Sequence, residues 1–196
     1  KADMISVQLA KIMKTLLVKR LDSSFYAFKQ SLKRYYQSNC VMLKMFENRR
    51  IYIAPKLKVN ELLSEGKEEE LIKLIEQSPY NDSTIDVYTP EDFDKPIYLD
   101  GLKHDNAVLE DLVTEWDKIN YDPKLDVFLD KLKNQLFDKS INREGKLVVF
   151  SESKETTDYL LKELEKQGYN KVLSVESSNR TEKMPLVSAN FDANYK

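Results

Sequence analysis

The chain has 196 residues, 41% of them apolar and 33% charged, and its formal net charge is -2. This composition allows a buried core in one large domain or two small ones, and it lacks the basic excess typical of strong nucleic-acid binders. One cysteine and one histidine exclude an internal disulfide framework and argue against a zinc site, so no metal site is expected.

Membrane and secretory signals are weak in this sequence. No apolar stretch approaches the ~20 residues needed to cross a bilayer. The opening KADMISVQLA lacks the long apolar segment of a signal peptide. We therefore expect a reducing, cytoplasmic setting without a membrane partner.

The first quarter of the chain predicts helix. Apolar residues recur at spacings of three and four through residues 6–47. The run DSS at 22–24 supplies short oxygen side chains that can cap a new helix, which predicts two helices with a break near Ser23, or one kinked helix. The following RRIYIAPK predicts a brief strand or extended connector that Pro55 ends.

Further helices are expected in the middle of the chain. Residues 59–77 predict two short helices around Gly66, and residues 78–102 carry turn formers that predict a loop region with a short turn after Pro90. Residues 107–119 predict a helix, and residues 122–138 predict another with a proline at its first position. The polar INREG then marks a junction that ends at Gly145.

The run LVVF at residues 147–150 is continuously apolar, which is typical of a parallel strand covered on both faces. A helix follows, Gly168 suits the left-handed position after its end, and residues 172–175 predict a second strand. The sequence therefore predicts a right-handed βαβ unit in an α/β, predominantly helical chain. Two strands make too little sheet, so we expect either a polypeptide cut inside a larger lobe or completion by RIYIA or PIYL.

Polar residues follow both predicted strands, where parallel sheets place their sites. Hydroxyls, helix N-terminal N–H groups and cations can bind phosphate oxygens. The candidate nucleic-acid-binding residues are Ser151, Ser153 and Lys154 after the first strand and Ser178, Asn179 and Arg180 after the second, with Thr156 and Ser177 beside them. Under the alternative interpretation, Ser153 simply caps the helix, and Glu155 or Glu152 interacts favourably with the positive end of its dipole.

Three stretches resemble one protein family. KLVVFSESKETTDYLLKELEKQGY resembles the start of the second RecA-like lobe of superfamily-two helicases, and DPKLDVFLDKLKNQL resembles the helix that leads into it. LLVKRLDSSFYAFKQSLKR resembles a helical segment between the motor lobes of bacterial Swi/Snf-like translocases. The resemblance implies an interlobe helical region at 1–121 and the first half of the second lobe, a partial RecA-like unit, at 122–196.

This resemblance implies a fragment of an ATP-dependent DNA helicase or translocase that contributes contacts to the nucleic-acid backbone. Its partners would be DNA and the remainder of the motor protein. No G-K-[ST] triplet occurs, so ATP and magnesium are expected only in the intact parent, and no catalytic residue is expected here. The alternative is a non-enzymatic helical protein-interaction module with a small α/β appendage, in which an apolar stripe of residues 23–47 receives another chain.

Four single features are assigned more ordinary roles. His104 stands beside Asp105, and we expect a helix-start contact rather than acid–base chemistry. Cys40 is expected to be a core thiol and Trp116 a core anchor. A phosphate-binding stripe is one interpretation of a basic aromatic stretch, but we favour an ordinary amphipathic helix with snorkelling lysines; the stretch consists of Lys29, Lys33, Arg34, Tyr35 and Tyr36.

Overall fold

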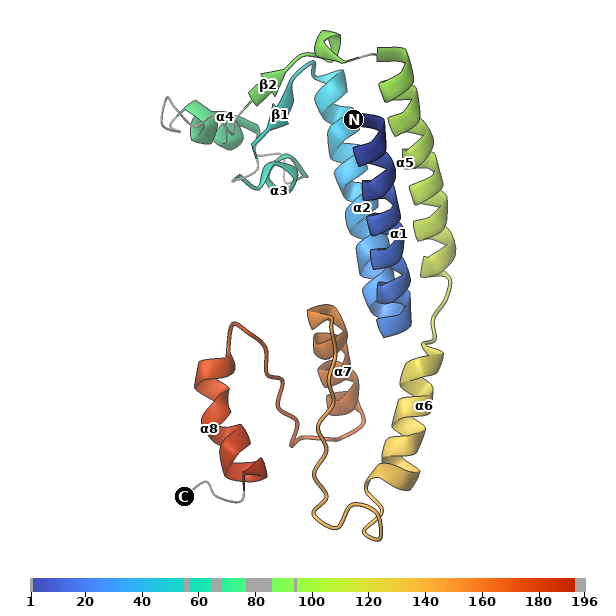
Figure 1. Ribbon diagram of the computed structural model, residues 1–196, viewed down its shortest axis with the longest axis vertical. Coiled ribbons are helices and arrows are strands. Elements are labelled where there is room, and N and C mark those ends of the chain that lie inside the picture. Colours follow the sequence, from blue (N-terminus) through green and yellow to red (C-terminus); the bar gives the residue numbers. More distant parts are fainter. Residues whose placement is uncertain (1, 55–56, 65–67, 77–85, 94, 193–196) are drawn as a thin grey trace. The chain divides into compact units, whose positions relative to one another are not determined.

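The computed structural model describes residues 2–54, 57–64, 68–76, 86–93 and 95–192. The described chain is predominantly helical and contains a small two-stranded antiparallel sheet. It divides into two compact units, the first formed by residues 1–30 and 121–196 and the second by residues 31–120. The helices and strands are labelled in Figure 1.

The second unit holds most of helix α2 (Phe25–Glu47), strands β1 (Ile51–Ile53) and β2 (Asp86–Tyr88), and helices α3 (Val59–Ser64), α4 (Glu68–Glu76) and α5 (Lys95–Asp117). A short 3-10 turn, η1 (Pro90–Asp92), follows β2. The two strands pair antiparallel, with Ile51 opposite Tyr88 and Ile53 opposite Asp86. The brief strand and the two short helices predicted on either side of Gly66 are confirmed, while Gly66 and Pro55 lie outside the described residues.

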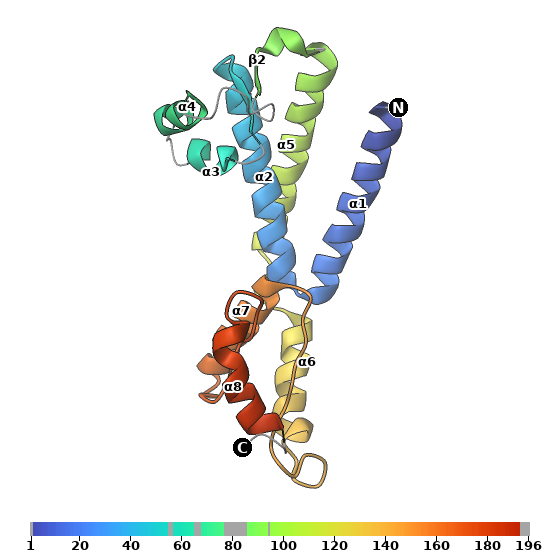
Figure 2. The same cartoon turned by 60° about the vertical axis from the view of Figure 1, so that its left-hand side comes forward.

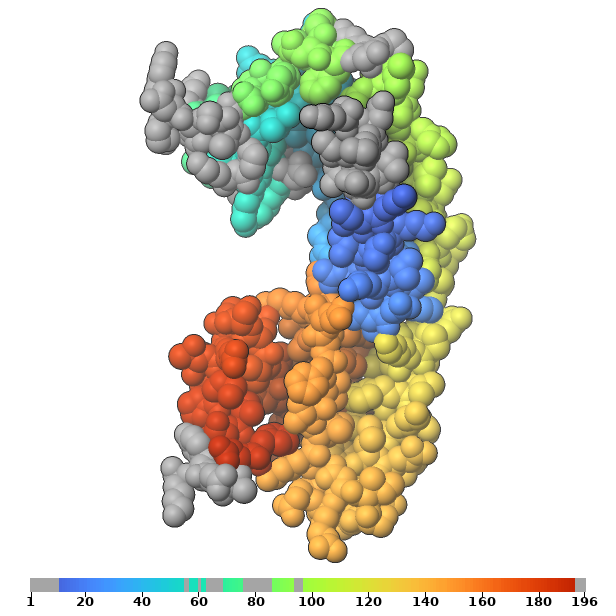
Figure 3. Space-filling view, in the orientation of Figure 1, coloured from blue at the N-terminus to red at the C-terminus, as the bar shows by residue number. Residues whose placement is uncertain are grey.

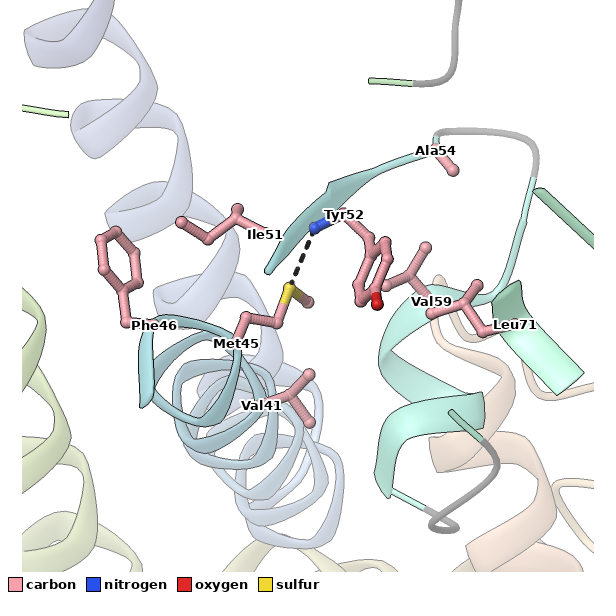
Figure 4. Close-up of a cluster of buried hydrophobic side chains, with 8 residues drawn as sticks. All are labelled: Val41, Met45, Phe46, Ile51, Tyr52, Ala54, Val59 and Leu71. Carbon is pink, nitrogen blue, oxygen red and sulfur yellow. Dashed lines mark hydrogen bonds between the residues drawn. The ribbon is translucent and has the colours of Figure 1, made fainter. Parts of the chain in front are cut away.

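An apolar cluster forms the core of this unit (Figure 4). Its side chains come from the end of α2, from β1 and from the short helices; they are Val41, Met45, Phe46, Ile51, Tyr52, Ala54, Val59 and Leu71. The backbone N–H of Tyr52 donates to the sulfur of Met45 across 3.4 Å, which joins the strand to the helix. The apolar stripe of α2 is thus largely buried within the chain rather than open to a partner.

Helices α2 and α5 run antiparallel to one another within the second unit, side by side in Figures 1 and 2. The thiol of Cys40 donates to Asn106 Oδ1 at 3.3 Å, and Lys33 Nζ lies 2.9 Å from Asp117. Lys33 is therefore paired with a carboxylate of α5. Cys40 is half-buried and does not belong to the apolar cluster, so the expected core position is only partly reached.

The first unit contains α1 (Ala2–Ser23), the start of α2, α6 (Pro123–Lys131), α7 (Lys154–Lys166) and α8 (Arg180–Phe191). A π-helical turn, η2 (Leu132–Leu136), extends α6. The break at Ser23 is confirmed, because α1 ends there and Ser24 Oγ accepts the N–H of Ala27 at 3.0 Å as the cap of α2. Gly168 follows α7 with a φ of 85°, in the left-handed region that was predicted.

Two extended segments, residues 146–151 and 171–176, precede α7 and α8. In Figure 1 both segments rise toward the helix that follows them, and both helices then descend. Within the residues that the structure describes, neither segment pairs with a strand. The expected parallel sheet is therefore not shown among the described residues.

The prediction that residues 147–150 are covered on both faces is wrong for this chain. Phe150 is 93% exposed, Val148 and Val149 are half exposed, and the segment lies at the surface of its unit in Figure 3. The physical reason is that no neighbouring strand or second layer packs on this segment in the described chain. RIYIA does not complete the expected sheet, because β1 pairs with β2, and PIYL lies inside helix α5.

The predicted loop at 78–102 is wrong where β2 and α5 form, while the short turn predicted after Pro90 is confirmed as η1. Pro96 falls in the first turn of α5, where its missing N–H costs no hydrogen bond. Leu99 and Leu102 pack against the apolar cluster and so stabilise this helical start. His104 consequently lies well inside α5 and is exposed, so the expected helix-start contact is also wrong.

None of the described helices has the length and apolar character needed to cross a membrane.

Candidate nucleic-acid interface

The first candidate loop forms the start of helix α7. Ser151 Oγ accepts the N–H of Ser153 and donates to its carbonyl, both at 3.2 Å. Ser153 is 4% exposed, and its Oγ caps α7 by accepting the N–H of Thr156 at 3.4 Å. The capping interpretation of Ser153 is therefore confirmed, and this hydroxyl is occupied inside the protein.

Arg20, near the end of α1, reaches the same helix start. Its Nη1 donates to Ser153 Oγ at 2.5 Å and to Glu155 Oε2 at 2.8 Å. Ser153 Oγ in turn donates to the same carboxylate oxygen at 2.9 Å. The negative charge of Glu155 lies in the first turn of α7, where it is favoured by the helix dipole as expected, and it also neutralises Arg20.

The turn between α1 and α2 also contacts α7. Thr156 Oγ1 lies 2.7 Å from Ser23 Oγ and 3.1 Å from Ser24 Oγ, and Ser24 and Thr156 are both buried. One turn further on, the rings of Tyr26 and Tyr159 stack with centroids 4.7 Å apart and an interplanar angle of 6°. These contacts satisfy the buried hydroxyls and anchor the start of α7 on a segment more than a hundred residues earlier in the chain.

The second candidate loop meets the first at Glu176. The Oε1 atom of Glu176 accepts from Lys154 Nζ at 2.9 Å and from Ser178 Oγ at 2.8 Å. Asn179 Oδ1 accepts the backbone N–H of Glu176 at 2.9 Å, and Arg180 is the first residue of α8. The structure thus brings Lys154, Ser178 and Asn179 together around one glutamate.

The pair formed by Lys154 and Glu176 dominates the local electrostatics. The hydrogen bond that Lys154 donates to Glu176 raises the pKa of Lys154 and lowers the pKa of Glu176. Ser178 adds to the second effect. Both side chains reach solvent, so dissolved salt weakens the pair and an incoming anion can compete for the ammonium group.

A hollow of about 460 Å³ lies beside the first loop. Its walls combine the exposed end of the segment before α7 with the end of α1 and with residues of α6 and α7; among them are Lys19, Ser23, Lys124, Phe128, Phe150, Ser151 and Leu160. Lys19 lies 3.9 Å from Glu152, and Lys124 donates to the backbone carbonyl of Asp22. The cations at this rim are therefore engaged with oxygens of the protein.

Over the described part of the chain, no group of three or more His, Cys, Asp or Glu side chains could hold a metal ion.

Sequence reasoning identified the two loops but missed the residues that organise them. Glu176 follows directly after the second apolar run, and this position at the end of a predicted strand could have marked it as a site residue. Arg20 carried no local signal, because its partners lie 133 and 135 positions away.

No family model, curated protein or solved structure matches this chain.

Proposed function

We propose that this chain is part of an ATP-dependent DNA helicase or translocase of the Swi/Snf-like group, acting in the cytoplasm. Residues 1–121 would belong to the interlobe helical region, and residues 122–196 would open the second RecA-like motor lobe. The sequence resemblance supports this assignment. The structural observation that carries it is the meeting of both candidate loops at Glu176, each at the start of a helix.

This arrangement resembles an unfinished α/β lobe. Two extended apolar segments, each followed by a helix, run in the same direction in Figure 1 and leave their side chains exposed. Further parallel strands of the parent lobe would pair the backbone groups of these segments, and its helices would cover their side chains. ATP and magnesium would bind in the intact parent, because the phosphate-cradling G-K-[ST] triplet does not occur here.

The proposed DNA contact is an exchange of anions at Lys154. In the free chain its ammonium group binds Glu176, and a backbone phosphate would take the place of that carboxylate. Ser178 would lose the same partner and become a donor to the phosphate, while Arg180 adds a neighbouring positive charge. Ser151, Ser153 and Asn179 would shape the loops, since their side chains bond within them.

The test is a salt titration of affinity for a short fluorescent DNA duplex, with the matching single strand and an RNA of the same sequence in parallel. A phosphate contact makes log affinity fall with log salt, with a slope of about -0.9 for each contact on duplex DNA. Lys154→Ala should make the slope shallower by about that amount. Glu176→Gln should strengthen binding, because it releases Lys154 from its carboxylate.

Glu163→Gln is the matched control, since it removes the same charge from an ion pair with Lys166 on the same helix α7. It should leave the affinity near that of the unmodified chain. A salt slope near zero for the unmodified chain, or equal effects of the two Glu→Gln substitutions, contradicts the proposal. The coding sequence of the parent should also carry a G-K-[ST] loop before this region and an arginine-bearing motif after it.

A protein-interaction module is the second candidate, and one observation favours it. Helix α1 exposes Ile12, Met13 and Leu16, and Val18 follows them on the same helix. An exposed apolar set of this kind fits a helix that docks on another protein. This function predicts no salt-dependent DNA affinity for any variant, so the same titration separates it from the motor function.

A further inference from the structure

We infer that Arg20 is a positioning residue for the first candidate loop, and this role rests on the proposed contact between Lys154 and DNA. Arg20 belongs to α1, whereas the loop belongs to the segment before α7. Its guanidinium touches both the cap of α7 and an acid in its first turn. Arg20 therefore acts through Ser153 and Glu155 and needs no contact with nucleic acid.

The geometry defines what Arg20 holds in place. Ser153 Oγ accepts from Arg20 and from the N–H of Thr156, and it donates to Glu155, so one buried hydroxyl joins three groups. The next residue after this cap is Lys154, whose backbone begins α7 and whose ammonium group points to Glu176. Restricting Ser153 on one side of Lys154 and Glu155 on the other restricts the direction of the lysine side chain.

A second set of contacts limits the same loop from the turn between α1 and α2. Thr156 Oγ1 lies within hydrogen-bond distance of Ser23 and Ser24, and Tyr159 stacks on Tyr26. The helix start is thus anchored both by Arg20 and by this turn. Loss of Arg20 should loosen the loop and the first turn of α7, residues 151–157, while the rest of α7 remains folded.

The effect of Glu155→Gln on DNA affinity distinguishes a positioning role of Arg20 from simple charge repulsion. Glu155→Gln removes a negative charge near the proposed phosphate site, and by simple electrostatics this change strengthens DNA binding. If Arg20 positions the loop through Glu155, the same substitution instead weakens binding, because the guanidinium loses its anionic partner. The expected loss is at least about threefold, whereas Glu176→Gln on the second loop has the opposite sign.

The experiment compares Arg20→Ala, Arg20→Lys and Glu155→Gln in the full chain, with Lys14→Ala as a control for loss of one positive charge from α1. Hydrogen exchange of the DNA-free protein is measured first. Arg20→Ala should speed amide exchange at residues 154–157 by about tenfold, the effect of one lost charge-assisted hydrogen bond. Exchange in α8 should stay unchanged, and Arg20→Lys should restore part of the protection, as a single cation can reach one of the two oxygens.

DNA affinity is then measured for the same variants at one salt concentration. Arg20→Ala and Glu155→Gln should both bind more weakly than Lys14→Ala. Unchanged exchange at residues 154–157 in Arg20→Ala, or tighter DNA binding by Glu155→Gln, overturns the positioning role. Altered exchange in a protein that never binds DNA contradicts the proposed function and leaves the structural role of Arg20 in place. Glu155→Gln is nearly isosteric, so it still decides the question if Arg20→Ala does not fold.

Discussion

Asp122 caps two helices at once, because one of its carboxylate oxygens accepts the backbone N–H of Phe25 at 3.1 Å. The other oxygen accepts the N–H groups of Lys124 and Leu125 at 3.1 and 3.2 Å. The first bond serves the start of α2, and the other two serve the start of α6. A single carboxylate, 5% exposed, therefore joins two helix N-termini that lie about a hundred positions apart in the chain.

Replacing this carboxylate should be costly. Asp122→Ala leaves N–H groups of two helices without their acceptor, and we expect the free energy of unfolding to fall by about 2 kcal/mol, roughly one for each lost cap. Urea denaturation followed by circular dichroism measures the change. Asp126→Ala, at an exposed acid in the first turn of α6, is the control and should cost under about 0.5 kcal/mol. Equal losses for the two variants would show that Asp122 is no special cap.

Two leucines of helix α4 should differ in how much they contribute to stability, because only one of them belongs to the apolar cluster of the second unit. Leu71 is fully buried, whereas Leu74, three positions later, is 38% exposed. Leu71→Ala should lower the free energy of unfolding by about 2–5 kcal/mol, because it leaves a cavity, and Leu74→Ala should cost about 1 kcal/mol or less. The fluorescence of Trp116, the single tryptophan, reports on this unit during denaturation. The prediction is wrong if the two losses are the same.

Replacing two of the glycines by alanine should change the stability of the chain in opposite directions. Gly168 follows α7 with a φ of 85°, and Gly168→Ala should destabilise the chain by about 1–2 kcal/mol through backbone strain. Gly101 lies inside α5, where an added methyl group would meet no neighbouring atom within 4 Å, so Gly101→Ala should stabilise by about 0.5–1 kcal/mol through helix propensity. Thermal unfolding of both variants tests the signs. A stabilising Gly168→Ala would contradict the left-handed end of α7.

The raised pKa of Tyr159 should make the folded chain less stable at alkaline pH. Burial, followed by the negative charge of Asp122, raises the pKa of Tyr159 to about 12. In the unfolded chain a tyrosine loses its proton near pH ~10. Between pH ~10 and ~12 the folded state thus holds more protons than the unfolded state, so the contribution of Tyr159 is fully present below pH ~10 and is lost as pH rises to about 12.

Urea midpoints measured across this pH window check the effect. Tyr159→Phe has no phenol to titrate and should show a shallower decline of stability above pH ~10 than the unmodified chain. Tyr121→Phe, at an exposed ring of the same unit, provides the comparison for loss of one hydroxyl. Identical pH profiles for Tyr159→Phe and the unmodified chain would argue against a raised pKa at this position.

Local signals predicted much of the secondary structure. Ser24, Asp122 and Ser153 each cap the helix that was expected after them, and Gly168 takes the backbone angle that only a glycine adopts easily. These features depend on interactions within a few residues, so spacing and residue type suffice to find them. The start of α5 at Lys95 was missed, because the turn formers before it were weighed without the packing of Leu99 and Leu102.

For the candidate site, the amino-acid sequence by itself determined the two polar loops, the residue types in them and the helices that follow. The tertiary structure decided which of these residues meet: Lys154 with Glu176, and Arg20 with Ser153 and Glu155. It also decided that Phe150 is exposed and that β1 pairs with β2. Caps and helices follow from neighbours along the chain, whereas burial and pairing depend on which distant segments are present to supply the other side of each contact.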